Sequence, residues 1–440
     1  MTDRYYIKGG TPLRGEVSIG GAKNSVLKLM AAAILAKGET KIYNVPDLTD
    51  VEIMLSVIEQ LGAKTSYNKQ EKSVVIDASD LTSITAKYEL VSKMRASFIV
   101  LGALVSRCRE AVVALPGGCA IGERRVDFHI KGLEALGAKI KIENGYVHAK
   151  APKLTGTDIY LDIPSVGATE NIMLASILAE GSTRIQNAAQ EPEIVDLANF
   201  LNTMGADVNG AGTSEIVING VKQEDLHSIE YTTIPDRIEA GTFMSAIIAT
   251  KGKAIIKGVF PAHLTFFTDK LLKMGANIKL LEPNSLEVSC KNRLNSINFV
   301  TQPYPGFPTD LQSMAMTLLT CANGVGIITE SLYENRFMQV PELRRMGADI
   351  HQDRNHAIVK GVKKLTGATL SASDLRAGAS LVVAALMAEG NSTIENLHHI
   401  DRGYENFENK IRLLGGKIER RDEEIITPIE PKVNITEGLL

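Results

Sequence analysis

LAKGETKIYNV (residues 35–45), LAEGSTRIQNA (178–188) and MAEGNSTIENL (387–397) are three versions of one sequence. Each follows an apolar run suited to a helix, and each leads into a second segment with helical periodicity. This second segment ends six times in LGA or a variant of it, at Gly62, Gly137, Gly205, Gly275, Gly347 and Gly415. The chain is therefore predicted to contain six copies of one unit of about 70 residues.

The pattern inside a unit predicts one buried helix, one surface helix and short strands. In the first unit the first helix (26–34) is apolar on nearly every side, so it should be buried all round, and Gly38 is expected as its left-handed C-terminal stop. A strand should follow at 40–45. The second helix carries one apolar stripe, formed by Met54, Val57, Ile58 and Leu61. Residues 138–150 are typical of a hairpin that turns at Asn144 and Gly145.

Six α/β units divide naturally into two sets of three, with the break near TTIPDRIEAG (232–241). The length of 440 residues also favours more than one domain. A repeat architecture alone would fit a structural solenoid without activity. Function therefore has to be argued from the residues at the ends of the helices.

Composition excludes several classes of protein. The chain is 44% hydrophobic and 22% charged with a net charge of -3, so no overall field attracts nucleic acid or an anionic membrane. The N-terminus has no apolar signal region, and no apolar run approaches the ~18 residues of a membrane span. The four cysteines of the chain match no zinc or CxxC spacing. We expect a cytoplasmic protein with no metal, no cofactor, no nucleic-acid partner and no membrane insertion.

Charged and polar residues occupy equivalent positions in the repeats. Those at the starts of the first helices are Lys23, Asn24, Arg95, Thr169 to Asn171, Arg237, Glu239, Asp310 and Arg376. Those at the junctions between strand and second helix are Cys119, Arg124, Glu191, Glu334, Arg336, Asp401 and Arg402. Equivalent ends of packed repeats point the same way, so helix N-termini and basic groups should converge on an anion. For any single residue, helix capping or a surface salt bridge is the alternative.

The stretch PGGCAIGERRVDFH (116–129) adds a candidate reactive group. Cys119 follows two glycines and precedes Arg124 and Arg125. Arginines lower the pKa of a nearby thiol and bind anions in a two-pronged fashion, which indicates chemistry on an anion. The alternative is a cysteine that only packs in the core.

Eight motifs in order resemble one family: GGAKNSVLKL (20–29), KMRASFIVLGAL (93–104), PGGCAIGERRVDFHIKGLEALGA (116–138), SVGATENIMLASILAEG (165–181), PDRIEAGTF (235–243), PYPGFPTD (303–310), YENRFM (333–338) and RGYENFENK (402–410). The family is that of the UDP-N-acetylglucosamine 1-carboxyvinyltransferases, the enolpyruvyl transferases of peptidoglycan synthesis. The resemblance covers Gly9 to about Arg420. It implies an inside-out α/β barrel in two domains, 23–233 and 1–22 with 234–440, in which the N-terminal strand crosses over.

The resemblance also implies the reaction and its residues. The enolpyruvyl group of phosphoenolpyruvate would pass to the 3′-hydroxyl of UDP-N-acetylglucosamine, and phosphate would leave. Cys119 corresponds to the proton donor, which can also trap phosphoenolpyruvate as an adduct. Lys23, Arg124 and Arg402 correspond to the cations that hold phosphoenolpyruvate, with Asn24 beside them, and Asp310 to the carboxylate at the sugar hydroxyl.

The remaining correspondences concern the sugar nucleotide and the lining of the site. Positions that hold the sugar nucleotide are Arg95, Arg124, Arg125, Val126, Asp127, Phe128, Ser165, Val166, Gly167, Asp310 and Leu332. Further residues lining the site are Asp374, Arg376, Glu334 and Arg336. No obligate protein partner is evident.

Two positions depart from the family pattern, since some relatives have proline at Arg125 and lysine at Ile163. The tail after Arg421 has no assigned role. Two alternatives stay open: enolpyruvyl transfer to shikimate 3-phosphate, and a silent paralogue that only binds a sugar nucleotide.

Overall fold

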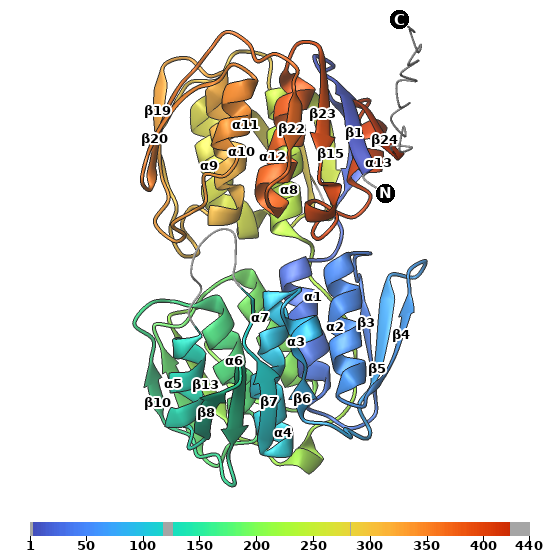
Figure 1. Ribbon diagram of the computed structural model, residues 1–440, viewed down its shortest axis with the longest axis vertical. Helices are drawn as coiled ribbons and strands as arrows, with labels where there is room; N and C mark the ends of the chain where they lie inside the picture. Colours follow the sequence, from blue (N-terminus) through green and yellow to red (C-terminus); the bar gives the residue numbers. More distant parts are fainter. Residues whose placement is uncertain (1–2, 118–125, 282, 423–440) are drawn as a thin grey trace, which may run out of the picture.

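The computed structural model describes residues 3–117, 126–281 and 283–422, and these form two lobes (Figure 1). The first lobe holds three four-stranded sheets: β14 (Glu230–Thr232), β3 (Glu39–Tyr43), β5 (Ser73–Asp77), β4 (Lys64–Asn68); β6 (Thr85–Ala86), β7 (Glu110–Ala114), β9 (Tyr146–Lys150), β8 (Lys139–Glu143); and β10 (Asp158–Tyr160), β11 (Ser182–Gln186), β13 (Glu215–Asn219), β12 (Asp207–Asn209). Each sheet belongs to one predicted unit, except that β14, from the end of the third unit, pairs with β3 in the sheet of the first unit.

The second lobe repeats this arrangement. Its sheets are β16 (Asn277–Leu281), β17 (Ser285–Ser289), β15 (Lys253–Lys257), β2 (Arg14–Ser18); β18 (Phe299–Val300), β19 (Val325–Thr329), β21 (His356–Lys360), β20 (Asp349–Asp353); and β22 (Thr369–Ser371), β23 (Asn391–Glu395), β1 (Asp3–Lys8), β24 (Lys417–Asp422). The predicted α/β fold of six repeated units is therefore confirmed.

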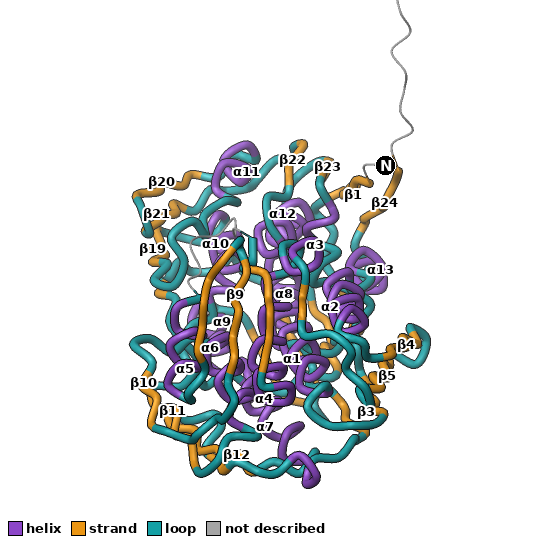
Figure 2. Tube along the Cα trace, turned by 60° about the horizontal axis from the view of Figure 1, so that its bottom comes forward, coloured by secondary structure: helices purple, strands orange, loops and turns teal. Residues whose placement is uncertain are grey.

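Six apolar first helices form the interior of the lobes. They are α1 (Lys23–Ala33), α4 (Val100–Cys108) and α6 (Val166–Ser176) in the first lobe, and α8 (Arg237–Ala249), α10 (Gln312–Thr320) and α12 (Leu375–Met387) in the second. In α6 every residue from Ala168 to Ser176 is buried, and in α10 every residue is buried. These helices pack on one another inside each lobe, while the strands lie around the outside (Figure 2). The prediction that they are buried all round is confirmed.

The second helices lie nearer the surface. They are α2 (Thr49–Gln60), α5 (Asp127–Ala135), α7 (Pro192–Thr203), α9 (Thr265–Met274), α11 (Val340–Arg345) and α13 (Phe407–Leu413). The stripe of Met54, Val57, Ile58 and Leu61 is fully buried while Glu52 and Glu59 are exposed, as predicted. The hairpin between β8 and β9 also turns as predicted, because Asn144 and Gly145 both have positive φ, at 53° and 78°.

The predicted helix stop was wrong. Gly38 does have a left-handed φ of 97°, but α1 already ends at Ala33 with Ile34 as its C-cap. The left-handed stops belong to the LGA glycines instead, where φ lies between 80° and 104° at Gly62, Gly137, Gly205, Gly275, Gly347 and Gly415. The repeated glycine therefore ends the second helix and turns the chain into the next strand.

The chain crosses between the lobes twice, at neighbouring places. β1 lies between β23 and β24, and β2 pairs with β15, so the N-terminal strands complete two sheets of the second lobe. The chain then enters α1 beside the segment that leads into α8, where Ala22 N donates to Ile234 O at 2.8 Å and Asp236 N to Gly20 O at 2.9 Å. One hydrophobic core is formed by residues between 26 and 229, and another by residues 5–19 with 238–418.

Across the part of the chain that the structure describes, we find no helix whose length and apolar character would let it span a bilayer.

Candidate active site between the lobes

Five of the predicted site residues open helices where the two lobes meet. Lys23 is the first residue of α1, Arg95 opens the 3-10 turn Arg95–Ile99 before α4, and Arg376 lies in the first turn of α12. Asp310 lies in the 3-10 turn Thr309–Leu311 before α10, and Arg237 begins α8. Helix starts offer backbone N–H groups and a partial positive charge, which suits an anion.

A buried carboxylate joins one cation from each lobe. Asp50, in the first turn of α2, accepts from Lys23 Nζ at 2.8 Å through Oδ2 and from Arg402 Nε at 2.9 Å through Oδ1. Burial alone would raise the pKa of the Asp50 carboxyl, but the charges of Lys23 and Arg402 outweigh it and hold that pKa below its usual range. Burial lowers the pKa of the Lys23 ammonium, while Asp50 acts in the opposite direction.

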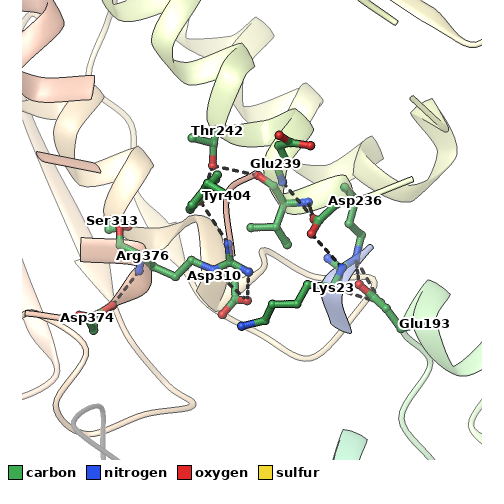
Figure 3. Close-up of polar contacts among 12 residues, drawn as sticks. Lys23, Glu193, Asp236, Glu239, Thr242, Asp310, Ser313, Asp374, Arg376 and Tyr404 are labelled. Carbon is green, nitrogen blue, oxygen red and sulfur yellow. Dashed lines mark hydrogen bonds and ion pairs between the residues drawn. The ribbon is translucent and has the colours of Figure 1, made fainter. Parts of the chain in front are cut away.

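Asp310 is held between two buried guanidinium groups. Arg336 Nη2 donates to its Oδ1 at 2.6 Å. Arg376 donates to its Oδ2 from Nη2 at 3.0 Å and from Nε at 3.3 Å (Figure 3). Arg376 also donates to the Tyr404 hydroxyl at 3.2 Å, and that hydroxyl lies 2.9 Å from Thr242 Oγ1. The charges around Asp310 stabilise its ionised form, and the contacts fix its orientation.

Three other predicted residues of the second lobe either cap a helix or are exposed. Asp374 caps α12, because its Oδ1 accepts from the backbone N of Arg376 and Ala377 at 2.8 and 3.0 Å. Leu332 is exposed and donates its backbone N–H to Glu330. Glu334 is exposed two residues before the buried Arg336. For Asp374 the capping alternative describes the observed contacts.

Predicted sugar-nucleotide residues of the first lobe share one wall, built around His129 of α5. A Cβ on Gly167 would lie 3.1 Å from His129 Cε1, so α6 begins directly against this ring. Burial, followed by the charges of Arg95 and Lys28, lowers the pKa of His129 to about 3. Other half-buried residues of this wall are Val126, Asp127 and Phe128 at the start of α5, and Ser165 and Val166 at the start of α6. Ser165 caps α6 by accepting from Ala168 N at 3.4 Å.

A second ion pair, buried on both sides, crosses between the lobes. Arg237 of α8 donates from Nε to Glu193 Oε1 of α7 at 3.0 Å, and their side chains are only 11% and 5% exposed. The guanidinium also lies over the ring of Tyr304, 5.5 Å from its centre.

Asn24 is half-buried at the start of α1, and its backbone carbonyl accepts from Lys28 Nζ at 3.3 Å.

Three predicted residues, Cys119, Arg124 and Arg125, lie outside the residues that the structure describes. Sequence analysis in turn missed Asp50 and Tyr404. Asp50 lies at the junction between strand and second helix in the first unit, and the same junction holds predicted site residues in other units. Extending the same alignment to LTDVE (48–52) would have found it. Tyr404 carries no comparable signal, since a tyrosine next to a glycine is common.

Comparison with known proteins assigns the family. The model for EPSP synthase (3-phosphoshikimate 1-carboxyvinyltransferase) matches residues 7–411. UDP-N-acetylglucosamine 1-carboxyvinyltransferase 2 of Carboxydothermus hydrogenoformans is 52% identical, over 95% of this chain and 99% of its own. The UDP-N-acetylglucosamine 1-carboxyvinyltransferase of Gloeobacter violaceus is 52% identical over 96% of this chain and 91% of its own.

Solved structures share the fold. The enolpyruvyl transferase NikO from Streptomyces tendae superposes with a TM-score of 0.86 at 27% identity, over 95% of this chain and 99% of its own. EPSP synthase from Acinetobacter baumannii gives a TM-score of 0.75 at 18% identity, over 96% and 100% of the chains, and at that identity supports the fold alone. By its near-complete similarity to these relatives, the chain belongs to the family of the UDP-N-acetylglucosamine 1-carboxyvinyltransferases.

Proposed function

We propose that this protein transfers the enolpyruvyl group of phosphoenolpyruvate to the 3′-hydroxyl of UDP-N-acetylglucosamine and releases phosphate, as a step of peptidoglycan synthesis. The observation that carries the proposal is the meeting of Lys23 from one lobe with Arg402 from the other on Asp50, close to Arg376, whose charge acts on Lys23. A small, multiply charged anion would meet several cations there. The names of relatives about half identical in sequence supply the acceptor, UDP-N-acetylglucosamine, and the carboxyvinyl group that is transferred. Phosphoenolpyruvate as the donor follows from the family resemblance.

In the proposed site, Lys23 and Arg402 hold the phosphate and carboxylate of phosphoenolpyruvate, with Asn24 beside them. Arg124, from the stretch 116–129, would add a third cation. Holding the anion among cations in a buried setting stabilises charge that develops during reaction more strongly than water would.

The proposed chemistry needs an acid and a base. The Cys119 thiol gives its proton to the methylene carbon of phosphoenolpyruvate, which makes C2 electrophilic. The 3′-hydroxyl oxygen bonds to C2 while its proton passes to Asp310. A proton then returns from the new methyl group to the Cys119 thiolate as the C2–O bond to phosphate breaks, and the departing phosphate takes the proton held by Asp310, which gives the enolpyruvyl ether and inorganic phosphate.

Asp310 suits this task in a particular way. Arg336 and Arg376 form ion pairs with its two carboxylate oxygens. Opposite charges at this distance stabilise the negative charge of a carboxylate and make it a weaker base. A weak base is sufficient, since the hydroxyl becomes acidic only as its oxygen bonds to C2. Asp310 then acts late, once bond formation has begun.

The sugar nucleotide would lie along the first-lobe wall. We assign its contacts to Arg95, Arg124, Arg125, Val126, Asp127, Phe128, Ser165, Val166 and Gly167, with Asp310 and Leu332 from the second lobe. Asp374, Arg376, Glu334 and Arg336 would line the opposite side. The proposed domains are 23–233, and 1–22 with 234–440. The cytoplasmic location and the lack of an obligate protein partner stay predictions.

The test is phosphate release measured with each acceptor separately. We expect release from phosphoenolpyruvate to depend on UDP-N-acetylglucosamine and not on shikimate 3-phosphate. Release with shikimate 3-phosphate would favour the sister reaction. Binding of UDP-N-acetylglucosamine with no release under any condition would favour a silent paralogue, and either result would refute the proposal.

A further inference from the structure

Asp50 touches both cations assigned to phosphoenolpyruvate, although they belong to different lobes. Its carboxylate is only 2% exposed, with Lys23 Nζ at 2.8 Å and Arg402 Nε at 2.9 Å. We propose that Asp50 is a positioning residue, which sets the spacing of Lys23 and Arg402 and keeps Lys23 protonated for the anion. This inference rests on the proposed function, which assigns the binding of phosphoenolpyruvate to Lys23 and Arg402.

The geometry leaves both cations able to bind a further anion. Asp50 takes one N–H of the Lys23 ammonium, and from Arg402 it accepts Nε–H together with a longer Nη2 contact at 3.4 Å. An ammonium has three donors and a guanidinium five, so each keeps donors for phosphate oxygens. One carboxylate between two cations also leaves a net positive charge, which suits a site that must bind and release an anion.

Several charged groups face Lys23. Asp50 comes from α2, Arg376 from α12, and Arg402 from the loop before α13, while the backbone N of Lys23 donates to Asp236 at 3.4 Å. The ammonium is buried, and two of these side chains carry like charge. Without the Asp50 carboxylate, Lys23 would face Arg376 and Arg402 with less compensation and would lose its proton at a lower pH.

A nearby contact provides a matched control. Lys72 Nζ of the first lobe lies 2.7 Å from Glu405 Oε2 of the second, and Glu405 Oε1 accepts from Asp47 N at 3.2 Å. This pair joins the same two units as Asp50 and Arg402 but contacts neither Lys23 nor Arg402 among the described residues. Lys72→Met therefore removes a connection between the lobes and leaves the two cations alone.

The experiment compares wild type with Asp50→Asn, Asp50→Glu and Lys72→Met. It measures kcat and KM for phosphoenolpyruvate, and inhibition by inorganic phosphate between about pH 8 and 10, where the charge of phosphate is constant. For Asp50→Asn we expect kcat/KM for phosphoenolpyruvate to fall at least tenfold. Inhibition by phosphate should disappear as the pH rises, and in the variant it should do so at a pH about one unit lower than in wild type. For Lys72→Met we expect neither change.

Asp50→Glu separates charge from position. It keeps the negative charge, so phosphate inhibition should keep the pH dependence of wild type, while the longer side chain displaces the cations and lowers kcat/KM. It also carries the test if circular dichroism shows that Asp50→Asn does not fold.

Three results would overturn the inference: wild-type kinetics in Asp50→Asn, wild-type kcat/KM in Asp50→Glu, or the same loss and shift in Lys72→Met. Failure of the proposed function would look different, since wild type itself would then release no phosphate. In that case, calorimetric binding of inorganic phosphate to wild type and Asp50→Asn still tests the positioning role, with weaker binding at high pH expected for the variant.

Discussion

At the scale of single residues, the cysteines differ sharply in what surrounds them. Cys290 is buried, Cys108 and Cys321 are half-buried, and burial raises the pKa of all three thiols. A thiol with a raised pKa is a poor nucleophile at neutral pH. Cys119, by contrast, stands in a sequence with two arginines close behind it. Reactivity should therefore be confined to Cys119.

We predict that an epoxide phosphonate such as fosfomycin adds to Cys119 and to no other cysteine when UDP-N-acetylglucosamine is present. Cys119→Asp should abolish the adduct and keep turnover, because a carboxylic acid can also donate a proton. Intact-mass analysis of both proteins measures the adduct, and phosphate release measures turnover. An adduct that persists in Cys119→Asp would contradict the prediction.

Single residues also mark the limit of sequence reasoning about the site. Lys23, Asp310, Arg336, Arg376 and Arg402 were all identified from repeat positions and motifs. The shared partner of Lys23 and Arg402 was not, since Asp50 lies 352 residues from Arg402 along the chain and no local pattern links these two residues. Periodicity indicates which face a side chain occupies, but pairing between lobes depends on how the whole chain closes.

At the scale of elements, local patterns were sufficient for the helices and the hairpin. Burial all round follows from a helix with no polar face, and the turn at Asn144 follows from a conformation that asparagine and glycine adopt readily. The prediction that α1 stops at Gly38 was wrong because the helix ends at Ala33 and the chain bends between Ala33 and Gly38 before it enters β3. Both N-terminal strands pair with strands formed hundreds of residues later, which no local pattern reports.

The LGA glycines support a prediction about stability. Gly62 and Gly137 both have φ near 100°, so alanine at either position should cost about 1–2 kcal/mol of backbone strain. At Gly62 a Cβ would also lie 2.5 Å from Thr82 N, whereas at Gly137 the nearest atom is Lys153 O at 3.3 Å. Gly62→Ala should therefore lower the urea midpoint of unfolding clearly more than Gly137→Ala. Equal midpoints would show that the contact with Thr82 has no role.

At the scale of the whole molecule, two separate hydrophobic cores meet through polar contacts. The described contacts between the lobes include the ion pairs of Arg402 with Asp50, Lys72 with Glu405, and Arg237 with Glu193. Polar contacts can open at lower cost than a shared apolar core, because water replaces the partners of the separated groups. This arrangement suits two lobes that must admit and release substrates.

The pair of Arg237 with Glu193 differs from the other two because both of its side chains are almost fully buried beside the crossing segments. Glu193→Gln would leave a buried guanidinium without its countercharge, which typically costs about 3–5 kcal/mol. We expect calorimetry to show a lower melting temperature and a wider separation between the unfolding of the two lobes. Lys253→Met, which removes a partly exposed pair with Glu287 inside the second lobe, should change stability by at most about 1 kcal/mol. If Glu193→Gln instead unfolded like wild type, the coupling of the lobes would have to come from the crossing segments themselves.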